Sequence, residues 1–493
     1  MNDRVTTHEF DWSKVHPQFL SFAWSNLWPR ERAKVLKGSP ATVWLFGAGA
    51  SHHYNTNPWG VPVPLASDFI RAMHSLPTSQ GFNSHIGPLI NYLENYRGID
   101  PRKVPEWTEN IEAFMTSVEV GIDELRKKKA KRALTADEVG DRFSLSAVFN
   151  NMSFICANVI NESQNGPLDP IYRSLLDFCG PEDVFVTFNW DTLLDRALAS
   201  TGGWSPNSGY GLTFTASLDG NWRKRVIGPV AYKTNWKLLK LHGSVNWLVP
   251  YTGVRLDSLE YSSIAPRSKE VFLYWQSTLR YKTHRGRWRG GYTPTCYAYY
   301  PPNLPGRYFR RQDIAAPKGH ALVSMTPITI YSALKEPNDS GVPSSPLLIT
   351  PVRQKAYAVH GGTIQSLWSQ TEVAIKNAAR LVIIGYSFPE TDTRPIELIR
   401  RALKSRMMIA VEVVAPDADQ IVTRLKGTIG DSDKLQAHSM TFVDYVFNVL
   451  GITAPAKMIE ALEVSREVRS WLERVYVMHA AAIRRQSASR KKS

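Results

Sequence analysis

The sequence VWLFGAGAS, residues 43–51, joins a short apolar run to two glycines that are separated by one residue. Apolar runs that end at a glycine are typical of buried strands in parallel sheets. Glycines after such a strand let backbone N–H groups approach a pyrophosphate, so Gly47, Ala48 and Gly49 are a candidate phosphate-binding loop. The Ser51 hydroxyl could add a hydrogen bond to the same phosphate. An ordinary strand-to-helix turn has the same pattern and is the alternative interpretation.

Similar apolar runs recur along the chain, and most of them lead into a helix-like segment. They cover residues 184–188, 237–241, 381–384 and 409–414. Strands that alternate with helices predict a mainly parallel sheet with helices on both of its faces. We therefore expect an α/β fold of the Rossmann type, in which ligands bind at the carboxyl ends of the strands.

Two stretches interrupt this alternation of strands and helices. Residues 104–161 carry apolar side chains at helical spacing, which predicts a helical insertion. Residues 251–320 are rich in aromatic residues and Arg, and form a second insertion. We expect a helical segment at 1–40, the Rossmann-type domain at 41–450, and an amphipathic helix with a basic tail at 451–493.

Bulk composition limits the class of protein. The chain has 493 residues, enough for one large core with insertions or for two ordinary domains. Its hydrophobic fraction of 43 %, with 15 Trp and 20 Tyr, is typical of a globular protein rather than a disordered one. No apolar stretch approaches the roughly 20 residues that a membrane-spanning helix needs, so we expect a soluble, cytoplasmic protein with no membrane partner.

The cysteine content and the net charge limit the kinds of site and partner that we expect for this chain. Cys156, Cys179 and Cys296 are isolated, and three scattered cysteines are too few for a disulfide framework or a four-thiolate zinc site. Buried, small hydrophobic side chains are their expected role. The net charge of +15 favours an anionic partner, which could be nucleic acid, a phosphorylated ligand or an acidic protein surface.

Polar residues follow the second and third predicted strands. The motif TFNWD places Thr187, Asn189 and Asp191 where open α/β sheets bind ligands. Asp191 could instead cap the helix that follows. The motif LHGS places His242 at the next strand end, and imidazole is suited to exchange a proton near neutral pH. A single histidine is more often structural, which is the alternative for His242.

The two later strands end in similar loops. Gly385 and Ser387 follow the run 381–384, and Pro416 and Asp417 follow the run 409–414. Because the carboxyl ends of parallel strands lie along one edge of a sheet, we expect all four polar strand ends to converge on one site.

Taken in chain order, these motifs resemble those of the sirtuin family, and most closely the sirtuin-like domains of bacterial antiphage defence systems. They are GAGAS, TFNWD, KLHGS and IIGYSF. The resemblance extends over about residues 43–414 and includes NIEAF at 110–114 and PLLITPVRQKAY at 346–357.

The resemblance implies a role for each motif. The pyrophosphate of NAD would lie on Gly47, Ala48, Gly49 and Ser51. The resemblance places Asn189 and Asp191 beside the nicotinamide ribose and matches His242 to the catalytic histidine of the family. It assigns Gly385 and Ser387 to the adenosine end, where Asp417 is a looser match.

The chain also departs from sirtuin deacylases in two places. Those enzymes carry a zinc ribbon of two Cys pairs after the histidine motif, whereas this chain has the aromatic and basic insertion with only Cys296. They also carry an acidic residue and an arginine after the glycine loop, where this chain has GVPVPLASDF at 60–69. We therefore expect no zinc or other metal, and expect NAD to be hydrolysed as a substrate to nicotinamide and ADP-ribose.

Several functions agree with these observations. Our first hypothesis is an NAD hydrolase that depletes NAD as an effector of antiphage defence and acts as a homo-oligomer. The second is a nucleotide-binding interaction module that assembles with an ATPase or a nuclease. In either case residues 251–320 could bind nucleic acid, because bases stack on aromatic rings and Arg contacts phosphates. An NAD-dependent protein deacylase is the third hypothesis and ranks below both.

Overall fold

The computed structural model describes most of residues 41–451. The exceptions are residues 58, 77–81, 165, 167, 220–221, 226–235, 255–263, 267–269, 276–281, 285–286, 290–319, 325–341, 351–360 and 390–391. The helical segment expected at 1–40, almost all of 451–493 and much of the insertion 251–320 therefore lie outside the described residues.

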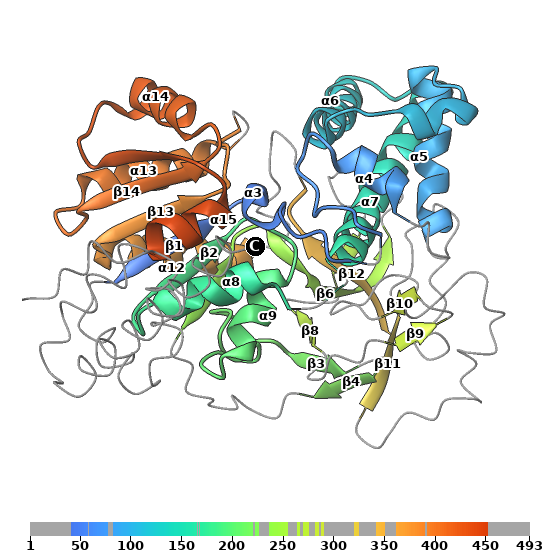
Figure 1. The fold of residues 1–493 in the computed structure, drawn as a ribbon. Helices are drawn as coiled ribbons and strands as arrows, with labels where there is room; N and C mark the ends of the chain where they lie inside the picture. The colour runs from blue at the N-terminus through green and yellow to red at the C-terminus, as the bar shows by residue number, and fades with distance from the viewer. Residues whose placement is uncertain are drawn as a thin grey trace, which may run out of the picture.

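A six-stranded parallel sheet forms the centre of the fold (Figure 1). Its strands lie in the order β15-β14-β13-β1-β2-β5, and all neighbours are parallel. Their bounds are β1 Thr42–Phe46, β2 Val184–Thr187, β5 Lys237–Lys240, β13 Arg380–Ile384, β14 Ala410–Ala415 and β15 Leu435–Ser439. Counted along the chain from β5, this order is 3-2-1-4-5-6, which is the Rossmann arrangement. The predicted fold class is confirmed.

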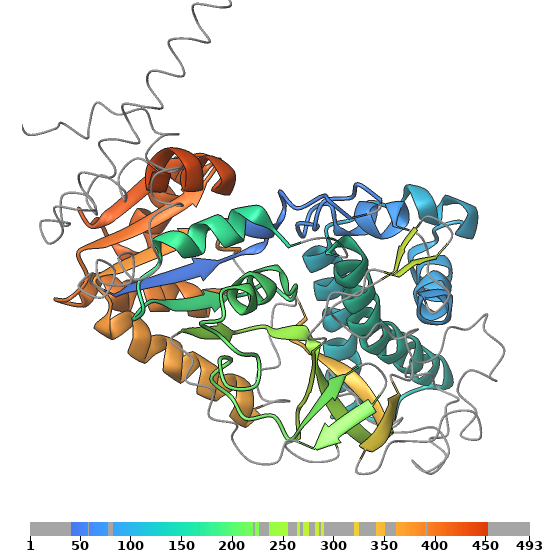
Figure 2. The same ribbon diagram turned by 60° about the horizontal axis from the view of Figure 1, so that its bottom comes forward.

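Helices cover both faces of this sheet (Figures 1 and 2). They are α3 Ala48–Ser51, α8 Pro170–Leu175, η3 Leu176–Phe178, α9 Leu193–Ser200, α12 Gly361–Asn377, α13 Thr393–Lys404, α14 Ala418–Ile429, α15 Phe442–Asp444 and η5 Tyr445–Leu450. Every residue of β1 and β14 is buried, as expected for strands covered on two sides. Helix α13 buries Leu398, Ile399 and Ala402 and turns its charged side chains outward, which explains its place on the sheet.

A second group of helices lies beside the sheet. It consists of α4 Phe69–Ser75, α5 Phe82–Arg97, η2 Pro101–Glu106, α6 Ile111–Lys129 and α7 Ala136–Ser163. This helical region is larger than the insertion predicted at 104–161, because α4 and α5 precede it and α5 packs on α7. We call the described residues from the loop before α4 to the end of α7, residues 61–163, the helical region below.

Helix α7 is the centre of the helical region. It begins with a capping box, in which Thr135 and Glu138 each bond the other's backbone N–H. By length and composition α7 could cross a membrane, a helix that the sequence analysis did not anticipate. However, 78 % of its most apolar window is buried inside the protein, as in the core helix of a soluble protein.

A second sheet, which the sequence did not predict, extends the central one. Its strands lie in the order β12-β11-β4-β3-β8-β6-β7. Their bounds are β3 Ala216–Asp219, β4 Trp222–Arg225, β6 Gly243–Val254, β7 Ile264–Pro266, β8 Phe272–Tyr274, β11 His320–Ser324 and β12 Val342–Leu348, and β9 Lys282–His284 pairs separately with β10 Arg287–Arg289. Only His242 and one preceding residue separate β5 from β6, so His242 lies at the junction of the two sheets.

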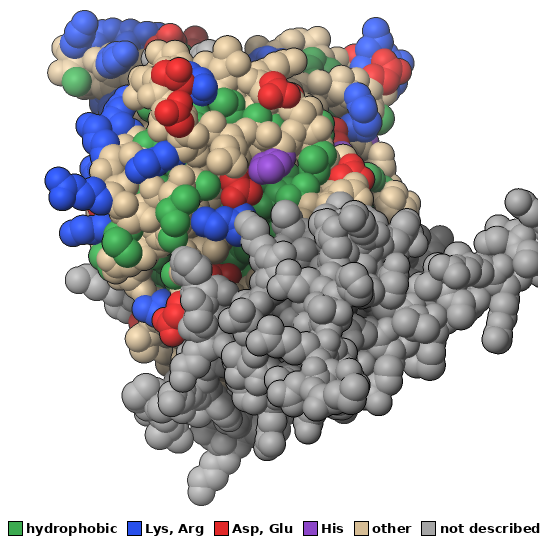
Figure 3. Space-filling view, turned by 60° about the vertical axis from the view of Figure 1, so that its left-hand side comes forward, with side chains coloured by type: hydrophobic (Ala, Val, Ile, Leu, Met, Phe, Trp, Pro, Cys, Tyr) green, Lys and Arg blue, Asp and Glu red, His purple; other side chains and the backbone are tan. Residues whose placement is uncertain are grey.

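Positive charge is not confined to the arginine-rich insertion. Figure 3 shows Lys and Arg side chains mainly along the margins of one face, with Asp and Glu side chains between them. The end of α13 contributes exposed Arg401, Lys404 and Arg406. Residues 41–250 and 321–450 nevertheless carry 32 Lys and Arg against 32 Asp and Glu, so the net charge of +15 comes from the two ends of the chain and the insertion 251–320.

Candidate functional site

A cavity of about 600 Å³ opens at the carboxyl ends of the central strands. The chain leaves β1 toward β2 on one side, whereas β13 and β14 lie on the other, so the direction of winding reverses between β1 and β13. Open α/β sheets bind ligands at such a switch point. The cavity volume also lies within the range of about 300–1,000 Å³ that is usual for small-molecule sites.

Three glycines bring the loops after β1 and β13 into direct contact. Gly49 N donates a hydrogen bond to the Gly385 carbonyl oxygen (2.9 Å), and Gly385 has a φ of +63°. A Cβ on Gly47 would lie 2.5 Å from that same oxygen, and one on Gly49 would lie 2.9 Å from Gly385 Cα. Because no side chains fill this space, Ala48 and Gly49 present their backbone to the cavity.

Asn189 lies at the end of β2, and three hydrogen bonds to its backbone and side chain fix its position. Its Nδ2 donates to the Gly47 carbonyl oxygen (2.9 Å) and to Ser51 Oγ (3.1 Å), and its backbone N–H donates to Thr187 Oγ1 (2.9 Å). A carbonyl oxygen can only accept, so the atom facing Gly47 must be the amide nitrogen. These bonds leave the Oδ1 atom of Asn189 as the part of the amide that can meet a ligand.

Gly47, Ser51 and Thr187, which the sequence assigned to NAD binding, do not line the cavity. The Ser51 side chain is fully buried and bonds Asn189 and Tyr172 (3.0 Å), because α3 turns it inward beneath the loop. Thr187 donates to the Phe46 carbonyl oxygen (3.2 Å) and supports the backbone of Asn189. Gly47, Ser51 and Thr187 therefore fix the position of Asn189 without lining the cavity themselves.

Asp191 lines the cavity but is 4 % exposed. Burial raises the pKa of its carboxyl group, while the nearby Lys240 ammonium and the Leu193 N–H oppose that rise. Its Oδ1 accepts from Leu193 N (3.0 Å), the first N–H of α9, although the N-cap residue of that helix is Thr192, which makes no side-chain capping bond. Lys240 is fully buried, and its ammonium group lies 3.1 Å from the Asp195 carboxylate. This buried ion pair is part of the polar network around Asp191.

His242 lies at the cavity end of β5. Its ring centroid is 4.8 Å from that of Phe188, and Phe188 in turn stacks on Tyr386 at 4.5 Å. The His242 carbonyl oxygen accepts from Ile349 N (2.9 Å) and Trp190 Nε1 (3.1 Å), which fixes the backbone on both sides. His242 and Asn189 therefore open into the same cavity from adjacent strands.

The loops after β13 and β14 form the other end of the cavity. Gly385, Ser387, Pro416 and Asp417 all line it, and Ser387 and Asp417 are exposed. The hydroxyl of Tyr386 donates to Asp392 Oδ2 (2.5 Å), which ties the loop to the start of α13. This end can offer hydroxyl and carboxylate oxygens to a polar ligand.

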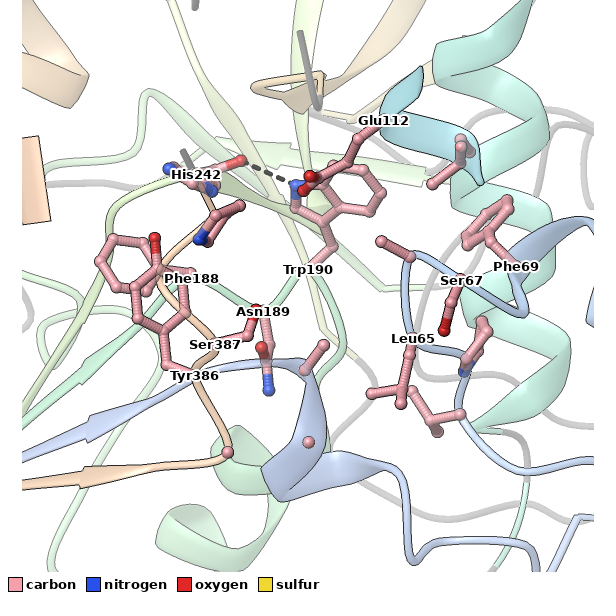
Figure 4. Close-up of a pocket in the computed structure, with 18 of the residues that line it drawn as sticks. Leu65, Ser67, Phe69, Glu112, Phe188, Asn189, Trp190, His242, Tyr386 and Ser387 are labelled. Atoms are coloured by element: carbon pink, nitrogen blue, oxygen red, sulfur yellow. Dashed lines mark hydrogen bonds between the residues drawn. The ribbon is translucent and has the colours of Figure 1, made fainter. Parts of the chain in front are cut away.

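The helical region supplies the facing wall, which the sequence analysis did not assign to the site. Leu65, Ser67, Phe69 and Glu112 line the cavity opposite Asn189 (Figure 4). The NIEAF motif was the sequence feature that could have identified this wall, because its Asn110 caps α6 and its Glu112 lies in the first turn of that helix. Trp190, between Asn189 and Asp191, also lines the cavity and was missed.

Metal-binding groups are not found among the described residues, where no cluster of three His, Cys, Asp or Glu side chains could hold an ion. Cys156 and Cys179 are buried, as expected, and burial raises the pKa of both thiols. Cys296 lies outside the described residues, so the expectation of a protein without zinc stays a prediction.

No protein-family model matches the chain, and no curated protein matches it. One solved structure, determined to explain the mechanism and regulation of Sir2 enzymes, is 12 % identical; the match covers 89 % of this chain and 100 % of the other, with a TM-score of 0.31. A Sir2 homologue in complex with NAD is 11 % identical, with 89 % and 96 % covered and a TM-score of 0.30. Because these TM-scores are low, the function must be argued from the geometry of the cavity.

Proposed function

We propose that this chain binds NAD⁺ and hydrolyses the bond between nicotinamide and ribose, releasing nicotinamide and ADP-ribose. One observation carries the proposal: Asn189 and His242 open into the cavity at the switch point that the glycine loop also lines. An amide and an imidazole at adjacent strand ends can hold a sugar and move its protons. The glycine loop beside them lets a diphosphate approach the backbone of Ala48 and Gly49 closely.

The arrangement also suggests the direction of the bound dinucleotide. Asn189 and His242 follow β2 and β5, on one side of the glycine loop, and Ser387 and Asp417 follow β13 and β14 on the other. The reacting ribose would therefore lie at Asn189, the diphosphate at Ala48 and Gly49, and the adenosine toward Asp417. A carboxylate there can accept hydrogen bonds from ribose hydroxyls.

The chemistry needs little from the protein beyond positioning and proton transfer. The C1′–N bond breaks with its electron pair going to the pyridinium nitrogen, so nicotinamide leaves neutral and needs no general acid. The ribose becomes oxocarbenium-like, and water forms the new bond to C1′. Asn189 Oδ1 would orient the ribose or the water, and His242 would accept a proton from a ribose hydroxyl or from the water. The buried Asp191, which lines the same cavity, would stabilise the positive charge.

Nicotinamide release by the purified chain tests the proposal. We expect Asn189→Ala and His242→Ala each to lower kcat at least about 100-fold, because each removes a group that acts on the reacting ribose. The matched control is Asn448→Ala, an exposed asparagine on η5, which should retain full activity. Unchanged turnover in either site variant would refute the assignment.

The masses of the products separate this proposal from the other functions. ADP-ribose indicates hydrolysis, a product of lower mass by one water indicates cyclisation, and transfer to an acyl-lysine peptide indicates a deacylase. A nucleotide-binding module would bind NAD⁺ and leave it intact. The further roles that we propose depend on the resemblance noted in the sequence. They are NAD depletion during antiphage defence in the cytoplasm, assembly as a homo-oligomer or with an ATPase, and nucleic-acid binding by residues 251–320.

A further inference from the structure

The wall that the helical region contributes carries a carboxylate. Among the described residues that line the cavity from this region, Glu112 is the titratable side chain. Figure 4 shows it reaching from α6 into the cavity, toward the wall that carries Trp190 and His242. Glu112 and His242 thus approach one cavity from opposite walls.

The backbone of Glu112 is held firmly. The Asn110 side chain caps α6 by accepting from Glu112 N (2.8 Å) and Ala113 N (3.3 Å). Ile111 N donates to the Ala66 carbonyl oxygen (3.0 Å), which fixes the start of α6 to another cavity-lining segment. These bonds fix the backbone from which the Glu112 side chain reaches the cavity.

We propose that Glu112 is a further catalytic residue, whose carboxylate takes the proton from the attacking water. This inference rests on the hydrolysis proposed above. As the C1′–N bond breaks toward nicotinamide, water oxygen bonds to C1′ and its proton passes to Glu112, which then returns it to solvent. His242 is left to exchange a proton with a ribose hydroxyl.

The surroundings of Glu112 and His242 support this assignment of the two proton transfers. In hydrolysis with inversion, water attacks the sugar on the face opposite the leaving group, and a carboxylate on that face is the usual base. His242 is 7 % exposed and packed on Phe188, whereas Glu112 is only partly buried and can exchange its proton with bulk water after each turnover. Asn189, Glu112 and His242 all line the one cavity in which the ribose would bind.

Azide tests the proposal, because an anionic nucleophile needs no proton removed. We expect Glu112→Ala to lower kcat for NAD⁺ hydrolysis about 100-fold or more, with the Kd for NAD⁺ changed less than about threefold. Added sodium azide should restore nicotinamide release at least about tenfold and give an azido-ADP-ribose detectable by mass. Glu112→Gln should behave in the same way.

Two controls make the outcomes decisive. Glu124→Ala changes an exposed glutamate farther along α6 and should match the unmodified chain with or without azide. His242→Ala should lose activity that azide does not restore. Full activity of Glu112→Ala, or a loss that azide leaves unrepaired, would overturn the inference while leaving NAD⁺ hydrolysis intact. If the unmodified chain releases no nicotinamide, the proposed function fails and this inference fails with it.

Discussion

The close contact between the glycine loops leaves no room for a side chain at Gly385. A Cβ there would overlap the Ala50 nitrogen and the Gly49 carbonyl carbon, and the φ of +63° is itself unfavourable for other residues. The neighbours are backbone atoms that cannot rotate away. We expect Gly385→Ala to lower the free energy of unfolding by about 2–3 kcal/mol and to weaken NAD⁺ binding, measured by urea unfolding and calorimetry.

The control for this prediction is Gly427→Ala in α14. A Cβ at Gly427 would meet no atom within 4 Å, and the residue is inside a helix. Replacing a helical glycine with alanine should stabilise the protein by about 0.5–1 kcal/mol. A Gly385→Ala protein as stable as the unmodified chain would show that the two loops can separate without cost.

The residues of the site also show what sequence patterns can and cannot reveal. Asn189 and His242 were predictable because strand ends in a parallel sheet share an edge, and both line the cavity. The inward turn of Ser51 was not predictable, because the pattern GAGAS does not say which way a side chain points from a short helix. Glu112 was missed as a site residue because its wall belongs to a helix distant in sequence from every strand end.

At the scale of elements, Glu412 joins three strands and a helix. From β14 it accepts two hydrogen bonds from Arg380 on β13 (3.0 and 2.6 Å) and one from Tyr445 on η5 (2.9 Å), and it lies 3.2 Å from His438 on β15. Burial alone would raise the pKa of this carboxyl group. The nearby His438, Arg380 and Tyr445 outweigh burial and lower the pKa to about 2.

The pH dependence of stability tests this network. Because the pKa of Glu412 is lowered on folding, its contribution is complete above about pH 4.5 and is lost as the pH falls toward 2. We expect Glu412→Gln to lower the free energy of unfolding by about 2–3 kcal/mol at pH 7, and by much less near pH 3. Urea unfolding at both pH values measures the difference.

Glu397→Gln on α13 is the matched control. Glu397 pairs with Arg400 and Arg401 on the surface, and exposed pairs contribute little, so the change should stay within about 0.5 kcal/mol. If the loss in Glu412→Gln were equal at both pH values, the ionised carboxylate would not be the source of the stabilisation.

Elements differed in how well the sequence predicted them. Strands β1, β2, β5, β13 and β14 are largely buried and therefore appear as mainly apolar runs. The edge strand β15, with the sequence LQAHS, is only partly buried and has no such run. The second sheet was missed because its main pairing joins β6 to β12, strands almost a hundred residues apart, and local patterns do not identify distant partners.

At the scale of the whole molecule, the cavity joins parts that are far apart in the chain. The sheet contributes the ends of β1, β2, β5, β13 and β14, and the helical region contributes the loop before α4 and the start of α6. Within the helical wall, Ile111 N bonds the Ala66 carbonyl oxygen and so joins these two segments. A ligand that fills the cavity must therefore contact both parts at once.

This leads to a prediction for the intact protein. We expect the His242→Ala protein to bind NAD⁺ without consuming it. NAD⁺ at about 100 times its Kd should then add about 2.7 kcal/mol to the free energy of unfolding of this variant. Hydrogen exchange should slow both at the glycine loops, residues 47–51 and 385–389, and at residues 61–69 of the facing wall. Protection confined to the glycine loops would mean that the facing wall does not contact the bound dinucleotide, and would remove Glu112 from the reaction.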